Sequence, residues 1–187
     1  MPSPKGPPEL KHLDHILVSQ LAIRRRIAEL GAQLNQDYAK KDLMVVAIVN
    51  GALIFTADLL RQMRSPLRLD CLRASSYHSG TRAVGEPRIV DQMKLDVKDQ
   101  HVLLVDDILD TGKTLAAVAG LIKSKGAASV KTCVLLDKKA RRAVPFEADY
   151  VGFEIPNEFV VGYGLDFNER YRNLPCIGVL KPKYYAG

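Results

Sequence analysis

The chain has 187 residues, 47% of them hydrophobic and 26% charged, with a formal net charge of +6 at pH 7. These values are ordinary for one globular domain and exclude a disordered chain, a collagen-like fibre and a disulfide scaffold. No apolar run approaches the ~18 residues of a membrane span, and residues 1–15 lack the apolar segment of a secretory signal. Cys71, Cys133 and Cys176 lie far apart, which favours free thiols in a reducing cytoplasm.

The positive charge is dispersed among acidic residues and has no aromatic platform beside it. We therefore expect no nucleic-acid partner and no membrane, and an anionic small-molecule substrate explains the charge at least as well.

In chain order, we predict a disordered tail over residues 1–9 and a single domain over residues 10–187. Ser19 is predicted to cap a helix that buries Ile23, Ile27, Leu30 and Leu34, with residues 24–26 turned mostly to solvent. The next elements are a buried strand over residues 43–49, a helix from Leu53 to about Arg64 whose apolar stripe begins with Leu53, Ala57 and Leu60, a strand over residues 67–72 and a buried strand over residues 102–105.

The second half of the chain continues this alternation. Leu115, Val118, Ala119 and Ile122 predict one face of a helix that ends before Gly126, and further strands are predicted over residues 130–136, 150–155 and 177–180. Alternating strands and helices predict an α/β fold with a mostly parallel sheet. Ligands of such sheets bind beyond the carboxyl ends of the strands.

Residues 75–88 interrupt the pattern with a polar, glycine-containing loop without periodicity. A loop of this length is typical of a binding loop or lid, and a surface insertion is the alternative.

The segment over residues 101–115 carries the richest chemistry. An apolar strand leads into Asp106 and Asp107, and a short loop then opens a helix. This loop consists of Asp110, Thr111, Gly112, Lys113 and Thr114. Amides at a helix N-terminus beside a glycine and small hydroxyl residues favour an anion, whereas paired carboxylates suit hydroxyl groups or a divalent cation. A capped helix after a charged turn is the alternative, and a Walker A loop is excluded because Asp107 stands where its first glycine is needed.

This segment fits the phosphoribosyl-pyrophosphate (PRPP) signature, two acidic residues followed by D-[ST]-G-x-T. Four more segments support the same family: VAIVNGALIF (46–55), RASSYHSG (73–80), LLDKKARR (135–142) and VGFEIPNEFVVGYGLDFNERYRNLP (151–175). The chain thus resembles the hypoxanthine-guanine branch of the type I phosphoribosyltransferase family. The resemblance implies a mainly parallel twisted sheet flanked by helices, with a small hood built from the N- and C-terminal segments.

The resemblance also implies an activity, the transfer of 5-phosphoribosyl from PRPP to hypoxanthine or guanine, giving IMP or GMP plus pyrophosphate. The loop over residues 110–114 would hold the 5-phosphate, and Asp106 and Asp107 would bind the ribose hydroxyls. Asp110 would be the general base near the purine N7.

The remaining implied roles concern pyrophosphate, metal, base and lid. Pyrophosphate would meet Asn50, Gly51 and Arg172, although many relatives carry a basic residue where Asn50 stands, and Asp166 would be a ligand of Mg²⁺. Lys138 would recognise the purine O6, because an ammonium only donates and mispairs with the 6-amino group of adenine. Lys139 is a rival for this role. Phe159 would stack on the base, the Val160 backbone would meet its N1/N2 edge, and Ser76 and Tyr77 would belong to a catalytic lid.

Family members are commonly homodimers or homotetramers, so the resemblance implies a homo-oligomer. Two alternatives stay open: a phosphoribosyltransferase that prefers xanthine, guanine or another base, and a regulatory protein that senses PRPP or nucleotides and binds RNA.

Overall fold

A six-stranded sheet forms the centre of the computed structural model, which describes residues 7–75, 78–79, 82–83, 88–89 and 93–185. The strand order is β6-β3-β2-β7-β8-β9, and all neighbours are parallel except β6 and β3. The strands are β2 (Leu43–Val49), β3 (Arg68–Ser75), β6 (Arg88–Ile89), β7 (His101–Leu109), β8 (Ser129–Asp137) and β9 (Tyr150–Glu154). A short antiparallel pair, β4 (His78–Ser79) and β5 (Arg82–Ala83), lies outside this sheet.

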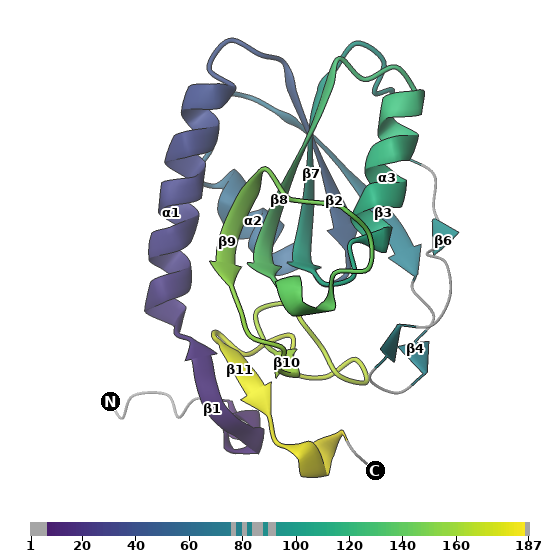
Figure 1. Cartoon of the computed structure of the whole chain (residues 1–187). Coiled ribbons are helices and arrows are strands. Elements are labelled where there is room, and N and C mark those ends of the chain that lie inside the picture. Colours follow the sequence, from purple (N-terminus) through teal and green to yellow (C-terminus); the bar gives the residue numbers. More distant parts are fainter. Residues whose placement is uncertain (1–6, 76–77, 80–81, 84–87, 90–92, 186–187) are drawn as a thin grey trace.

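Helices cover both faces of the sheet, which explains the apolar runs in its central strands. The helices α1 (Gln20–Asp37) and α2 (Leu53–Leu60) lie on one face and α3 (Lys113–Ser124) on the other (Figure 1). In β2, Val45 packs into the core cluster under α1 and α2, whereas Met44 and Val46 pack into the cluster under α3. The first six residues of this strand are therefore buried regardless of the face to which they point.

The sequence prediction for α1 is confirmed. The Ser19 side chain accepts a hydrogen bond from the Ala22 backbone amide at 3.2 Å, and the four predicted apolar residues are buried. Arg26 differs from the expected solvent-facing arginines, because its Nε donates to the Gly152 carbonyl at 3.0 Å and its Nη2 to the Val151 carbonyl at 2.8 Å. This arginine therefore ties α1 to the edge strand β9.

The prediction for α2 is wrong in length and in buried face. The helix ends at Leu60 and buries Phe55, Thr56 and Leu59, while the predicted stripe residue Leu53 is 57% exposed. The helix has only eight residues and is apolar on most sides, so the spacing of its apolar residues does not identify the buried face. The strand predicted over residues 102–105 is also longer, since β7 continues to Leu109 and includes both aspartates of the acidic pair.

The N- and C-terminal segments form a second, antiparallel sheet, the hood, with the order β1-β11-β10. Its strands are β1 (Leu13–Val18), β10 (Val160–Val161) and β11 (Ile177–Leu180), and the 3-10 helices η1 (Pro8–His12) and η3 (Pro182–Tyr184) lie beside them. Figure 1 shows the strands of the central sheet pointing toward the hood. The mainly parallel sheet with a small hood is thus confirmed. Within the described ranges, no helix has the length and apolar character that crossing a membrane requires.

Candidate active site

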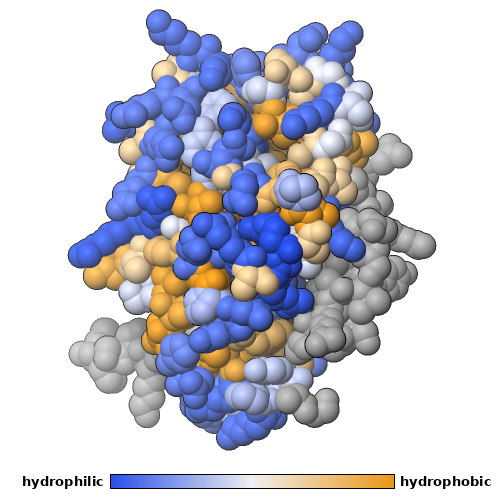
Figure 2. Space-filling model, viewed as in Figure 1, coloured by the Kyte–Doolittle hydropathy of each residue, from blue (hydrophilic) through white to orange (hydrophobic). Residues whose placement is uncertain are grey.

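The sequence-predicted residues gather where the carboxyl ends of β2, β7 and β8 face the hood. Figure 2 shows hydrophilic side chains across the middle of this face, over the same end of the sheet. Asn50 and Gly51 follow β2, the loop over residues 110–114 follows β7, and Lys138 follows β8. The topology therefore brings together residues that are nearly 90 positions apart, at the edge where such sheets bind ligands.

The loop between β7 and α3 is built for close approach of an anion. Gly112 is the N-cap of α3, and its φ of +82° is a left-handed conformation that favours glycine. A Cβ at this position would lie 3.0 Å from Val144 Cγ2 and 3.2 Å from Arg142 Cδ. Gly112 has no side chain that could cap the helix, and at its first turn the Lys113 amide donates to the Thr111 hydroxyl oxygen at 3.4 Å.

Asp106 and Asp107 form an acidic pair near the end of β7, in which Asp106 is buried and Asp107 half-buried. Their carboxylates are locally ordered, since Asp106 Oδ1 accepts from the Asp107 amide at 3.0 Å and Asp107 Oδ1 from the Ile108 amide at 2.8 Å. Burial and the charge of Asp107 raise the pKa of Asp106 well above its usual range. Burial also raises the pKa of Asp107, against the opposing effects of Asp106 and Arg172. Such a pair presents acidic oxygens that can hydrogen-bond a diol.

The two neighbouring lysines after β8 have different environments. Lys138 is 5% exposed; its Nζ donates to the Glu158 carbonyl at 2.8 Å and its backbone amide to the Leu109 carbonyl at 2.9 Å. Burial lowers the pKa of Lys138, and the charge of Asp110 opposes this effect. Lys139 instead reaches the surface, where its Nζ lies 2.8 Å from Glu154 Oε2.

The turn after β2 contacts the acidic pair and the hood. The Val49–Asn50 peptide bond is cis, and Asn50 is exposed. A Cβ at Gly51 would lie 1.9 Å from Asp107 Oδ2, and a Cβ at Gly164 would lie 2.1 Å from the Gly51 carbonyl oxygen. The backbone of this turn is therefore packed directly between β7 and the loop after β10, with no room for a side chain at either glycine.

Arg172 and Asp166 meet beside this turn. Arg172 Nη2 lies 2.9 Å from Asp166 Oδ1, and Arg172 Nη1 donates to the Gly164 carbonyl at 2.8 Å. The other carboxylate oxygen of Asp166, Oδ2, accepts from the Glu169 amide at 3.0 Å. Both oxygens of Asp166 are thus engaged by protein donors, and among the described residues no three His, Cys, Asp or Glu side chains group as a set of metal ligands. Contact of this carboxylate with Mg²⁺ would therefore run through water held by the ion, which keeps several waters in such sites.

An aromatic cluster from the hood closes the other side of the site. Phe159 stacks on Tyr185, with ring centroids 4.6 Å apart, and meets the edge of Phe167 at 5.5 Å. Val160 is buried in β10, where it pairs with Val179. Tyr185 therefore covers one face of Phe159.

Sequence reasoning missed Arg141, Arg142 and Gly164. The two arginines contact the loop of Asp110, as described below, and Gly164 packs on Gly51. The segment LLDKKARR contains a signal for the arginines, because it places two adjacent guanidinium groups just after a predicted strand. The resemblance implied roles for its lysines alone. Ser76 and Tyr77 lie outside the described residues.

Comparison with known proteins places the chain in a family. Residues 15–168 match the phosphoribosyl transferase domain. The chain is 48% identical over 171 residues to a hypoxanthine-guanine phosphoribosyltransferase of Streptococcus pneumoniae, a match covering 91% of this chain and 95% of that one. It is also 46% identical over 174 residues, 93% of this chain, to the bifunctional protein TilS/HprT of Listeria innocua, but spans only 27% of its length.

A solved structure agrees with these matches. The crystal structure of a hypoxanthine phosphoribosyltransferase from Staphylococcus aureus superposes with a TM-score of 0.90 at 43% identity, covering 95% of this chain and 97% of that one. The resemblance predicted from the sequence is thus confirmed. The chain belongs to the hypoxanthine-guanine branch of the type I phosphoribosyltransferase family, the enzymes of purine salvage.

Proposed function

We propose that this chain transfers 5-phosphoribosyl from PRPP to hypoxanthine or guanine, forming IMP or GMP and releasing pyrophosphate. One observation carries the proposal. The backbone amide of Lys138 donates to the Leu109 carbonyl, which sets the buried lysine directly beside the loop that begins at Asp110. A donor for a 6-oxopurine and a loop for the 5-phosphate of PRPP therefore lie at adjacent strand ends.

In this proposal, Asp110 is the general base. As N9 of the purine forms its bond to C1′ of PRPP, the bond from C1′ to pyrophosphate breaks and the N7 proton passes to the Asp110 carboxylate. Asp110 Oδ1 is buried and accepts no hydrogen bond in the described part of the chain, so it has acceptor capacity for this proton. Asp106 and Asp107 would hold the ribose hydroxyls, and Thr111, Gly112, Lys113 and Thr114 the 5-phosphate.

Base recognition falls to Lys138 rather than Lys139, because only Lys138 is buried at the site. Its ammonium would donate to O6 of hypoxanthine or guanine and mispair with the 6-amino group of adenine. Phe159 would stack on the base through the face that Tyr185 does not cover, and the Val160 backbone would meet the N1/N2 edge.

Pyrophosphate would lie between the turn after β2 and Arg172. Gly51 brings backbone close to the ligand, Asn50 can donate a neutral hydrogen bond, and Arg172 supplies positive charge. Asp166 would hold Mg²⁺, largely through water. The metal, when bound, would neutralise charge on pyrophosphate as it leaves.

The remaining parts of the proposal rest on the family resemblance. Ser76 and Tyr77 would belong to a lid that excludes water from the reacting sugar. The chain would assemble as a homodimer or homotetramer. The three free cysteines favour the reducing cytoplasm as its compartment.

The first experiment supplies the purified chain with PRPP, Mg²⁺ and one base at a time, and follows nucleotide formation by absorbance. Turnover of hypoxanthine and guanine, with adenine inert, supports the proposal. Preferential turnover of xanthine would change the substrate, and binding of PRPP without turnover of any base would instead support a sensor.

The second experiment tests the base itself. Asp110→Asn keeps the shape of the side chain but cannot take a proton, so kcat should fall on the order of 10²–10⁴-fold while the protein stays folded. Asp42→Asn is the matched control, since Asp42 precedes β2 at the opposite end of the sheet and forms an exposed pair with Arg68. Near-normal turnover of the Asp110 variant would exclude the role.

A further inference from the structure

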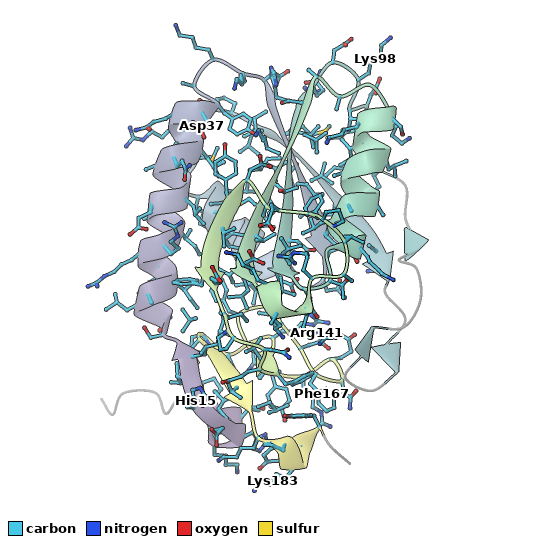
Figure 3. The ribbon with its side chains drawn as sticks, viewed as in Figure 1. His15, Asp37, Lys98, Arg141, Phe167 and Lys183 are labelled. Carbon is cyan, nitrogen blue, oxygen red and sulfur yellow. The ribbon has the colours of Figure 1, made fainter. Side chains whose placement is uncertain are left out.

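Two adjacent arginines, Arg141 and Arg142, lie against the loop of Asp110 and have no part in the function proposed above. Arg141 is the last residue of the short 3-10 helix η2 (Lys139–Arg141). Figure 3 places Arg141 between the end of the central sheet and the hood. Ala143, which follows Arg142, donates its backbone amide to the Thr111 carbonyl at 2.9 Å. The segment over residues 141–143 thus runs along the loop over residues 110–114.

Arg142 holds the main chain of this loop. Its side chain is 13% exposed, and its Nη1 donates to the Leu109 carbonyl at 3.1 Å and to the Asp110 carbonyl at 2.5 Å. Its Nη2 pairs with the buried carboxylate of Asp137, the last residue of β8. One planar guanidinium therefore joins the ends of β7 and β8, and the backbone of Asp110 cannot move without breaking these contacts.

Arg141 contacts the side chain of the same aspartate. Its Nε lies 3.3 Å from Asp110 Oδ1, and the two side chains are 28% and 29% exposed. This Oδ1 is buried yet accepts no hydrogen bond in the described part of the chain. The contact is one of charge, so it can set the direction of the carboxylate while leaving the oxygen able to accept a proton.

The charges around Asp110 are asymmetric. Lys138 from the end of β8 and Arg141 from η2 face its side chain, whereas Arg142 is engaged with its carbonyl. A partly exposed ion pair adds little to folding stability. The cost of removing Arg141 should therefore appear in turnover rather than in unfolding.

We propose that Arg141 is a positioning residue for Asp110. Its guanidinium orients the carboxylate for the purine proton, and Arg142 fixes the main chain from which that side chain extends. The inference rests on the proposed role of Asp110 as general base. It assigns to Arg141 no contact with PRPP or with the purine.

The test compares Arg141→Gln and Arg141→Lys with Arg25→Gln, a control at an exposed arginine of α1. Arg141→Gln should lower kcat roughly 10-fold or more, because a misdirected catalytic group is costly. The KM for PRPP should change less than about two-fold and the Tm should match that of the control. Arg141→Lys should recover part of the loss, since it keeps the charge without the planar fork. Unchanged kcat, or a KM for PRPP that rises as much as kcat falls, would overturn the inference.

A double variant separates this inference from the proposed function. If Arg141 acts through Asp110, adding Arg141→Gln to Asp110→Asn should cost no further activity. Losses that multiply would show that Arg141 acts elsewhere. If kcat falls in the Asp110 variant but not in the Arg141 variant, the positioning role of Arg141 alone is refuted. If kcat is normal in the Asp110 variant, the general-base role of Asp110 and the positioning role of Arg141 are refuted together.

Discussion

Replacing Lys138 by methionine tests which of the two lysines after β8 reads the purine. Methionine keeps the unbranched, buried stem but removes every donor. A hydrogen bond from a charged donor is worth about 1.5–3 kcal/mol, so kcat/KM for hypoxanthine and guanine should fall roughly 10- to 150-fold. The ratio of hypoxanthine to adenine turnover should fall too, because the mismatch with the 6-amino group disappears.

The neighbouring lysine provides a matched control. Lys139 lies on the surface in an ion pair with Glu154, so Lys139→Met should change kcat/KM less than about two-fold. Thermal unfolding verifies that both variants fold. In Lys138→Met, the lost hydrogen bond to the Glu158 carbonyl opposes the relief of a buried charge, so the Tm should stay within about 5 °C. Equal activity of the two variants would refute the assignment of the purine contact to Lys138.

Two further predictions concern the acidic pair and the glycine contact. Burial and Asp107 raise the pKa of Asp106, so the folded state binds more protons than the unfolded one from about pH 4 upward, and stability falls as pH rises through that window. Asp106→Asn should weaken this pH dependence in urea unfolding and raise the Tm at neutral pH; an unchanged slope would contradict the argument. Gly164→Ala, at a φ of +104° and against the Gly51 carbonyl, should lower the unfolding free energy by about 1–3 kcal/mol and reduce kcat/KM. Gly120→Ala is its control, because no atom lies within 4 Å of a Cβ there.

Local patterns were sufficient wherever one physical signal dominated. The 18-residue α1 has a full apolar stripe and a serine cap, and the uninterrupted apolar run of β2 matches a strand buried on both faces. The start of α3 was equally predictable, because Gly112 and its hydroxyl neighbours are contiguous in the sequence and the helix begins directly after this glycine.

Patterns failed where packing across the chain decided the outcome. In α2, Phe55 is buried and Leu53 is exposed. A short and mostly apolar helix can bury any of its faces, so the fit against the core cluster beneath α1 decides which one is buried. Periodicity could not separate Lys138 from Lys139 either. The Lys138 ammonium donates to the Glu158 carbonyl, whereas the Lys139 ammonium pairs with the Glu154 carboxylate at the surface. Both partners lie more than a dozen residues further along the chain.

The sequence by itself determined the family and the α/β architecture, because each depends on neighbouring residues whose spacing is visible in the chain. Only the tertiary structure decided which charges meet. Arg141 reaches the Asp110 carboxylate, and Gly164 packs on Gly51, across 31 and 113 positions. The physical reason is that the strength of an ion pair and the fit of two groups depend on their distance and burial in space. The fold sets both by bringing the ends of parallel strands to one edge of the sheet, whatever the separation of the residues along the chain.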